Sequence, residues 1–499
     1  MKQSSLFFLL SIILLSACKK DDALETVQED PSSFSEIGSV SIGGTGAAEI
    51  TAYDPSTKKL FVVTNTGSAT KIDVINLSDP AAPSAMGSID ISIYGGYVNS
   101  VAVHDGKLAA AVEGVLKTDP GKAVTFKTSD HSLIKQVTVG AQPDMISFSK
   151  DGKYILTANE GEPNDAYTID PAGTVSIITV ADNYSVATID FSSFASQLAS
   201  LQAKGFRMFG PNASFVQDIE PEYITISSDS KTAWVTLQEN NAIAKIDIPS
   251  KTVVSIMPLG FKNYNVDANA IDPSDKDMAM VLGKWNVKGM YQPDAIAVYE
   301  KNGIPYLFTA NEGDVREWAA FAENKRVKDI ALDLTAFPDG ANLKLEAKLG
   351  RVDITRMSGD AGNDGDYDEL YSFGSRSFSV WNGNTGDQVF DSKNELETKA
   401  IALGKYDDNR SDDKGVEPEG ITLGMMGKKM IAFIGMERAD LLAIYDVTDP
   451  LNPIFLKILS TGDAPEGITF IPADQSLSGK SLVIVSSEND GVIKIYRTN

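Results

Sequence analysis

A short sequence that places an acidic residue just before an apolar strand recurs along the chain. It is clearest as EPEGIT at residues 417–422 and returns as APEGIT (464–469), EPEYIT (220–225), QPDMIS (142–147) and QPDAIA (292–297). Two weaker copies stand at residues 48–51 and 98–101. The acids at this position are Glu49, Asp144, Glu222, Asp294, Glu419 and Glu466, with Asn99 in the remaining copy. Carboxylates repeated at one structural position can bind a hard cation or act as a general base.

A second series of acids ends the strand that follows each copy. Its members are Glu113, Glu160, Glu239, Glu312, Glu437 and Glu488, with Asn65 in the first unit. Each lies 14 to 22 residues after the residue that begins its unit, which fits one hairpin with a turn of variable length. The two ends of a hairpin meet at the same place. If the first strands line a central channel, the two series form two rings of carboxylates at one channel mouth.

Twelve carboxylates held together at low dielectric repel one another strongly. They must be neutralised by raised pKa values, by Arg and Lys, by backbone N–H groups or by cations. One interpretation is that each acid accepts hydrogen bonds from turns and holds neighbouring units in register. For the ring as a whole we expect at least one divalent cation, with calcium favoured because carboxylate and carbonyl oxygens select hard ions. The predicted metal ligands are Glu160, Glu222, Asp294, Glu312, Glu419, Glu437, Glu466 and Glu488.

Basic residues near these acids are the candidates for binding an anion or another ligand. Arg438 directly follows Glu437, and Arg376 lies in the sequence GSRSFS. The chain has two histidines, and His104 falls in a turn at the opposite end of its hairpin. A histidine-rich zinc site and a Ser-His-Asp triad are therefore poorly supported. No catalytic residue is assigned.

Short strands must position these residues. From residue 34 on, runs rich in Val, Ile, Phe and Tyr alternate with Gly, Asp, Asn and Pro clusters, which predicts an all-β fold. The tightest spacings between units are 45, 47 and 50 residues, typical of β-propeller repeats. The seventh unit contains three strands, and residues 35–42 form a strand with no partner of its own. We expect the two to pair and close a seven-bladed β-propeller over residues 34–499; an open stack of small sheets is the alternative.

Extra sequence lies at positions that all open toward the predicted mouth. Residues 161–172 and 314–375 follow second strands, and residues 192–219, 261–291 and 391–416 precede first strands. The largest block, at about residues 314–416, is interpreted as an insertion in the propeller domain. Residues 193–204 predict a short amphipathic helix. Insertions gathered on one face usually build a binding surface.

The first 18 residues have the pattern of a secretory signal, with Lys2 followed by an apolar stretch at 6–15. LSAC at residues 15–18 resembles a bacterial lipobox, which would make Cys18 the lipidated first residue of the mature protein. KKDD at 19–22 resembles the export tag of surface lipoproteins, and residues 19–33 predict a flexible tether. We expect an outer-membrane lipoprotein exposed at the cell surface, or alternatively facing the periplasm. A plain periplasmic protein with an incidental cysteine is the other interpretation.

Composition limits the classes of partner. The chain has 44 basic and 68 acidic residues, for a net charge of −24. Nucleic acid is a poor candidate because its phosphates need basic side chains. Cys18 is the single cysteine, so no internal disulfide can form. The hydrophobic content of 42% supplies ample material for a core.

Several further motifs resemble one known family. These are YQPDAI (291–296), TANEGD (309–314), LQENNA (237–242), DELYSFG (368–374) and SRSFS (375–379). Together they are similar to the bacterial choice-of-anchor I domain, over about residue 36 to the end. The resemblance implies a YVTN/WD40-like β-propeller presented outside the cytoplasm on one of several anchors. It implies no settled activity, although relatives have been labelled alkaline phosphatase or phytase-like.

Two functions follow from these observations. The first is an extracytoplasmic, lipid-anchored binding module whose acidic channel mouth binds a divalent cation and whose loops contact an unknown extracellular ligand. The second is a metal-dependent phosphoester hydrolase acting on a phosphorylated small molecule, in which clustered cations hold phosphate and activate water.

Overall fold

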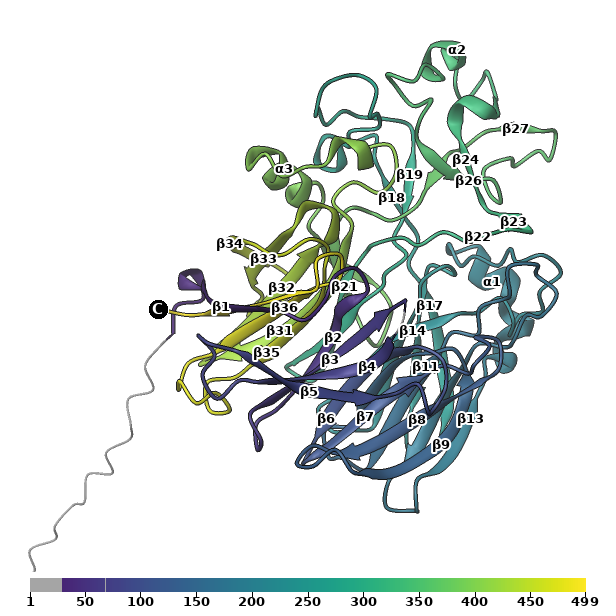
Figure 1. Cartoon of the computed structure of the whole chain (residues 1–499). Coiled ribbons are helices and arrows are strands. Elements are labelled where there is room, and N and C mark those ends of the chain that lie inside the picture. The colour runs from purple at the N-terminus through teal and green to yellow at the C-terminus, as the bar shows by residue number, and fades with distance from the viewer. Residues whose placement is uncertain (1–28, 68) are drawn as a thin grey trace, which may run out of the picture.

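A computed structural model gives the structure of the chain and describes residues 29–67 and 69–499. The predicted signal at residues 1–18, its Cys18 and residues 19–28 of the tether lie outside the described residues. The described chain is all-β, with strands arranged in small sheets around a common centre and a separate group of loops and short strands above them (Figure 1).

Seven sheets within the described residues have four antiparallel strands each. The first four are β2 (Ala47–Asp54), β3 (Lys59–Thr66), β4 (Ala69–Asn76) and β5 (Ser84–Asp90); β6 (Val98–His104), β7 (Lys107–Val112), β8 (Pro120–Lys127) and β9 (Leu133–Ala141); β10 (Pro143–Phe148), β11 (Tyr154–Asn159), β12 (Thr174–Thr179) and β13 (Ser185–Ile189); and β14 (Pro221–Ile226), β15 (Thr232–Leu237), β16 (Ala242–Asp247) and β17 (Thr252–Pro258).

The remaining three sheets carry the second half of the chain. They are β20 (Ile296–Lys301), β21 (Ile304–Ala310), β29 (Phe378–Asn382) and β30 (Gln388–Asp391); β31 (Pro418–Met426), β32 (Lys429–Met436), β33 (Leu441–Asp446) and β34 (Ile454–Ser460); and β35 (Pro465–Ile471), β36 (Leu482–Ser487), β37 (Val492–Arg497) and β1 (Ser35–Ser41). In the last sheet, β1 pairs with β37 from Ser35 opposite Arg497 to Ser41 opposite Val492.

The first strands of successive sheets contact one another, and β35 of the last sheet contacts β2 of the first. The hydrophobic core lies between neighbouring sheets. Phe61 and Val74 of one sheet, for example, pack with Leu108 and Phe126 of the next. Small twisted sheets packed face to face with their first strands innermost form a β-propeller.

The recurrent motif has a defined backbone geometry. The residue before the motif proline is left-handed in four copies, with φ between 40° and 57°: Gln142, Gln292, Glu417 and Ala464. In the first copy Ala48, directly before Glu49, is left-handed instead, with φ 61°. Where the strand begins, the pairing register then shifts, as between Pro143 and Met145, so Asp144 has no cross-strand partner. A β-bulge re-aims the extra side chain. The bulge therefore turns Asp144 toward the centre around which the sheets are arranged.

Two insertions that flank the β20–β21 hairpin fold together into one unit, here called the cap (residues 261–291 and 314–375). Its five-stranded sheet contains β18 (Phe261–Asn263), β19 (Lys288–Met290), β28 (Tyr371–Ser372), β26 (Asp353–Thr355) and β24 (Asn324–Arg326). Two strand pairs and a helix complete it: β22 (Glu317–Trp318) with β23 (Phe321–Ala322), β25 (Ala331–Leu332) with β27 (Asp366–Tyr367), and α2 (Gly340–Leu343). The cap has a core of its own, which includes Tyr264, Val287 and Ile354.

Two predicted boundaries are corrected by the structure. The block at 314–416 is not one insertion, because β29 and β30 inside it complete the sheet of β20 and β21. The predicted tether at 19–33 extends too far, because its last residues dock on the final sheet. Glu29 accepts hydrogen bonds from the Ser481 backbone N–H at 2.7 Å and from the Thr498 hydroxyl at 2.6 Å.

Helices are short. The predicted helix at 193–204 forms as η2 (Ser192–Gln197) followed by α1 (Leu198–Gln202), and α3 (Glu395–Ala402) follows β30. The other helical turns are η1 (Pro31–Ser33), η3 (Asp267–Asn269), η4 (Val327–Asp329), η5 (Asp408–Arg410) and η6 (Glu437–Ala439). Between residue 29 and the C-terminus, residue 68 aside, no helix has the length and apolar content needed to cross a bilayer.

The pairing of β1 with the last sheet predicts that Phe34 is essential for stability. Phe34 is fully buried and packs edge-on against Phe433, with ring centroids 5.5 Å apart. Phe34→Ala should lower the free energy of unfolding by about 3–5 kcal/mol, measured by urea denaturation. Met86→Ala, at a position 55% exposed, is the matched control and should change it little. Equal stability of the two variants would show that the N-terminal segment is not docked.

Candidate functional site

Acids of the recurrent motif line a cavity of about 120 Å³ in the centre of the propeller. Asp144, Glu222, Asp294, Glu419 and Glu466 line it together with Asn99, and these five acids are here called the channel ring. Four of them are predicted metal ligands, and Asp144 belongs to the same series. The carboxylate of Glu49, at the equivalent place in the first sheet, accepts a hydrogen bond from Asn65 Nδ2 at 2.9 Å.

The channel ring is not neutralised by basic side chains. None of its five carboxylates forms an ion pair with a described Lys or Arg. Glu222, Glu419 and Glu466 each have one buried carboxylate oxygen without a hydrogen-bond partner. A buried acceptor left unpaired is costly, and a charged one more so. The ring therefore requires protons or cations.

Burial raises the pKa of every member of the channel ring. It raises the pKa of Asp144 to about 7, with Glu113 adding repulsion. It also holds the pKa values of Glu222 and Asp294 well above the usual range, and each has another carboxylate as its strongest electrostatic neighbour. Glu419 and Glu466 behave in the same way. Ile421, Ile468 and Met145 line the cavity beside the acids and supply part of this apolar surrounding.

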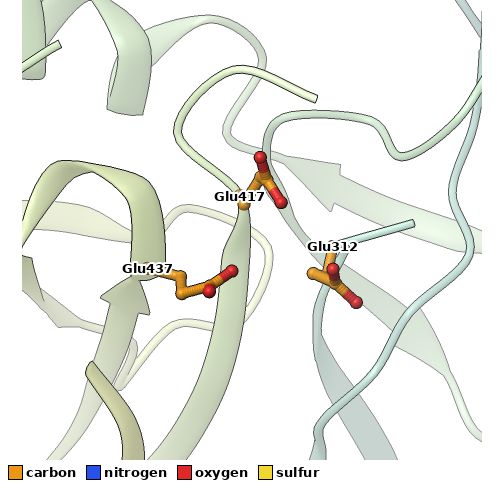
Figure 2. Close-up of side chains that lie close together, drawn as sticks. All are labelled: Glu312, Glu417 and Glu437. Carbon is orange, nitrogen blue, oxygen red and sulfur yellow. The ribbon is translucent and has the colours of Figure 1, made fainter. Parts of the chain in front are cut away.

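Three further glutamates meet at the edge of the mouth. Glu312 follows β21, Glu417 precedes β31, and Glu437 begins η6; Figure 2 shows their carboxylates converging from three separate segments. One oxygen of each lies within 4.8 Å of the others, and the three are here called the glutamate triad. Sequence reasoning predicted Glu312 and Glu437 but missed Glu417. Its position before the motif proline was the available signal, because three other copies have Gln or Ala there and only one other, with Glu220, has an acid.

The glutamate triad, unlike the channel ring, is charge-balanced by three basic residues. Lys414 contacts Glu312 and lies 3.2 Å from Glu417 Oε2. Arg410 donates to Glu417 at 2.7 Å, and Arg438 Nη1 lies 2.8 Å from Glu437 Oε1. Burial opposes ionisation of Glu312, but Lys414 outweighs it and lowers its pKa. Burial raises the pKa of Glu437 to about 8, with Arg438 opposing the shift.

The other two predicted metal ligands neither line the channel cavity nor belong to the glutamate triad. The carboxylate of Glu160 accepts a hydrogen bond from Gln142 Nε2 at 2.5 Å, and burial holds its pKa well above the usual range. The backbone N–H of Glu488 donates to the Ala464 carbonyl at 3.0 Å. The eight predicted ligands are thus divided: four in the channel ring, two in the glutamate triad, and two elsewhere at the mouth.

The prediction that Arg376 binds an anion or ligand is corrected by its contacts. Arg376 is 2% exposed, and it donates to the carbonyls of Asp272, Ser411 and Asp413 and to the Glu397 carboxylate. These acceptors come from two different insertions, residues 261–291 and 391–416. Arg376 therefore joins the cap to the propeller, and its guanidinium is not available to a ligand.

A buried ionic network also joins the insertions at the mouth. Arg316 donates to Asp218 at 2.8 Å and to Glu220 at 2.9 Å, all three being buried. Arg207 pairs with the buried Glu323 of the cap. The Phe209 ring lies between the two guanidinium groups, whose carbons are 4.3 Å and 4.5 Å from its centroid. These contacts fix the cap above the mouth.

Comparison with known proteins identifies the family to which this fold belongs. The model of the choice-of-anchor I domain matches residues 49–450, which is most of the chain. The chain belongs to the choice-of-anchor I domain family. Gigasin-3a of Magallana gigas is 26% identical over 189 residues, covering 31% of this chain and 66% of that protein, just under two thirds of its length.

Solved structures resemble this choice-of-anchor I domain only at low similarity. Hydrazine synthase of Kuenenia stuttgartiensis has 13% identity and a TM-score of 0.48, covering 92% of this chain and 97% of that one. The Cps50 (Swd1) β-propeller domain of Myceliophteria thermophila has 8% identity and a TM-score of 0.46, covering 93% and 100%. A chain of the mitotic checkpoint complex has 11% identity and a TM-score of 0.48, covering 100% of this chain and 99% of that one. No functional conclusion rests on these likenesses.

The raised pKa values predict that stability falls as the pH rises. A carboxyl group whose pKa is higher in the folded protein binds more protons there than in the unfolded chain. Its contribution to stability is complete at a pH below its pKa in the unfolded chain, and it is lost as the pH rises through its pKa in the folded protein. The folded values are about 7 for Asp144 and about 8 for Glu49, against 3.8 and 4.5 ordinarily. We expect the chelator-treated protein to have a lower Tm at pH 8 than at pH 5 by scanning calorimetry.

Two variants separate this effect from general charge repulsion. Glu49→Gln should flatten the decline of Tm with pH, because it removes a group that titrates in this window. Asp105→Asn changes the net charge equally at a side chain that is 86% exposed and should leave the decline unchanged. A Tm that is constant between pH 5 and pH 8 in all three proteins contradicts the assignment.

Proposed function

We propose that this protein is an extracytoplasmic binding module whose channel ring holds a divalent cation, with calcium favoured. One observation carries the proposal: Glu222, Glu419 and Glu466 direct carboxylates without basic partners at one cavity, and each has an unpaired buried oxygen. A bound cation would neutralise these carboxylates in their ionised form. Without a cation, the carboxyl groups must stay protonated, which requires raised pKa values. Carboxylate oxygens favour Ca²⁺ and Mg²⁺ over softer metals.

The cation would be held partly through water. Among the described residues, the glutamate triad alone brings three ligand oxygens within 4.8 Å of one another, so the ring acids stand farther apart. A cavity of about 120 Å³ has room for several water molecules. Hard cations bind readily with a partial water shell. The ring thus fits a hydrated ion, whereas the glutamate triad is already balanced by Lys414, Arg410 and Arg438.

The ring geometry depends on closure of the propeller. We propose that the seven four-stranded sheets are seven blades and that β1 closes the ring by pairing with β37. Contact between β35 and β2 and the pairing of residues 35–41 with 492–497 support this. A closed ring leaves no exposed sheet edge at the seam and fixes the distances between ring carboxylates.

We further propose a lipid anchor at Cys18, which would hold the module at the outer membrane with the cap facing away. The LSAC sequence supports the anchor. In Figure 1 the start of the described chain, beside β1, lies far from the cap with its α2 and β27. Surface exposure is the favoured orientation, and a periplasm-facing anchor is the alternative.

A metal-dependent phosphoester hydrolase is the second candidate. A hollow of about 380 Å³ beside the glutamate triad contains Lys405 and Arg438 together with Glu437, which could face a phosphate and a metal ion. Arg438 is engaged with Glu437 at 2.8 Å and lies 3.6 Å from Glu417, so a phosphate would have to compete with two carboxylates. We therefore place the binding module first.

The first test is whether the protein purifies with a divalent cation. Elemental analysis of protein prepared without chelator should find calcium near one equivalent per chain, and an EDTA-treated sample should lose it. Calorimetric titration of calcium into the stripped protein should show binding that weakens as the pH falls from 8 to 6, because protons compete for the raised-pKa carboxyls.

Substitutions assign the ion to the channel ring. Glu419→Gln combined with Glu466→Gln should weaken calcium binding at least tenfold, whereas the exposed Asp105→Asn should not change it. A folded protein without any divalent ion at pH 8 contradicts the cation proposal. Calcium-dependent release of phosphate from p-nitrophenyl phosphate that is lost in Glu437→Gln would instead support the hydrolase.

The anchor proposal predicts that Cys18 alone determines membrane association. The full-length chain expressed in a Gram-negative host should sediment with membranes and gain mass from acyl groups, detected by mass spectrometry. Cys18→Ser should remove both properties while leaving a folded protein. Membrane association that survives Cys18→Ser contradicts lipid anchoring. Protease accessibility on intact cells distinguishes the surface from the periplasm.

A further inference from the structure

The first strands of the propeller enclose a second, larger space of about 540 Å³, here called the turn-face cavity. Its lining comes from the first strands of five sheets, β10, β14, β20, β31 and β35, and from the turns beyond them, where Lys150 and Ser228 lie. Met425, near the end of β31, also lines it and is 47% exposed. The acids of the channel ring stand at the opposite ends of these strands. The turn-face cavity therefore opens on the face away from the mouth and the cap.

The turn-face cavity adjoins the cavity of the channel ring. The two cavities share four lining residues: Met145, Tyr223, Ile421 and Ile468. Each of these follows the ring acid of its own strand by one or two positions, so the shared boundary lies directly beside the ring. The Met145 Sδ accepts a hydrogen bond from the Ile224 backbone N–H at 2.8 Å, which fixes this side chain at the boundary. The space around the ring thus continues toward the turn face.

Hydroxyl groups recur on the wall of the turn-face cavity. Ser147, Thr225 and Thr422 each stand three residues after the ring acid of their strand, and all three line the cavity. Hydroxyl oxygens accept from water and can face a hard cation in its water shell. Lys150 is the one base among the described lining residues, and Glu300, of opposite charge, also lines the cavity. Both are exposed at the rim, where water and salt screen their charges.

The mouth side of the channel ring carries more positive charge. Lys414 contacts Glu312, and Gln238 Nε2 donates to Glu312 Oε2 at 2.9 Å, so this acid is bound on both sides. Glu312 is in turn the strongest electrostatic neighbour of Asp294, which places this group next to the ring. Arg438 lies at the same edge of the mouth. A cation that arrives from the mouth must therefore pass an ammonium and a guanidinium group, and like charges repel.

We propose that the cation enters and leaves the channel ring through the turn-face cavity, on the face opposite the cap. This inference rests on the cation site proposed above for the ring. The cavity has room for an ion with its water shell, and its hydroxyl groups lead from the rim to the boundary beside the acids. Ion exchange is then separate from the surface of the cap, so a ligand held there does not trap or exclude the ion.

A thiol placed on the cavity wall tests the route, because Cys18 is the single cysteine of the chain. In the Cys18→Ser protein, Thr225→Cys puts a thiol in the turn-face cavity. Thr45→Cys puts one on the mouth face, in an exposed loop whose hydroxyl reaches the Asn489 carbonyl. Each protein is modified with benzyl methanethiosulfonate, a neutral and bulky reagent, and then loaded with calcium. Calcium release to the chelator quin-2 is followed by stopped flow, and the equilibrium Kd is measured by calorimetric titration.

Benzyl modification of Thr225→Cys should slow calcium release at least about fivefold and leave the Kd unchanged, because an obstacle on the route slows entry and exit equally. Methyl methanethiosulfonate on the same thiol and the benzyl reagent on Thr45→Cys are the matched controls and should change neither quantity. Thr422→Cys, on another strand of the cavity wall, repeats the test, so a folding defect in one variant does not decide the result.

Two outcomes separate this inference from the proposed function. Normal calcium binding with unchanged release in both benzyl-modified cavity variants overturns the route alone, as does slower release when Thr45→Cys is modified. Absence of calcium binding in the unmodified protein contradicts the cation site itself, and the route is rejected with it.

Discussion

Carboxylates that cannot move apart must be neutralised, and this requirement governs the centre of the molecule. The chain meets it differently at different places. Basic residues from an insertion balance the glutamate triad. Amide side chains serve Glu160, through Gln142, and Glu113, through Asn99 at 3.1 Å. The channel ring has neither kind of partner, and burial among other carboxylates raises the pKa values of its members. The channel ring, whose carboxylates lack basic and amide partners, is therefore the first place to look for a bound ion.

Backbone geometry makes this concentration of charge possible. A left-handed residue followed by a bulge turns Asp144, Glu419 and Glu466 out of the regular alternation of their strands, so one short sequence gives the same side-chain direction in different sheets. The strands behind it pack in ordinary apolar layers between sheets. Apolar packing between sheets thus stabilises the fold, and the irregular start of the first strand sets the direction of the acidic side chains.

The strands and the motif acids could be predicted from the sequence because both depend on local patterns. Alternating apolar runs located the sheets, and the repeated EPEGIT-like sequence located the channel ring. The balancing residues could not be predicted: Lys414 and Arg410 lie in an insertion without periodicity. Nor could the cap, because Tyr264 and Ile354 share a core only after two separate insertions meet. Arg376 was misread for the same reason, since its acceptors are far away in sequence.

The pairing of Ser35 with Arg497 has a consequence for how the protein is made. The last sheet joins the two ends of the chain, so it cannot form until the C-terminal strand has left the ribosome. Closing a loop of this length is entropically expensive and slow compared with forming local hairpins. Five of the other sheets can assemble from strands that follow one another in the chain, and the sixth joins β21 to β29 across one insertion, while the seam stays open. Pairing of β1 with β37 is then a late event of folding, and until it occurs the two unpaired strand edges are the part of these sheets most exposed to aggregation.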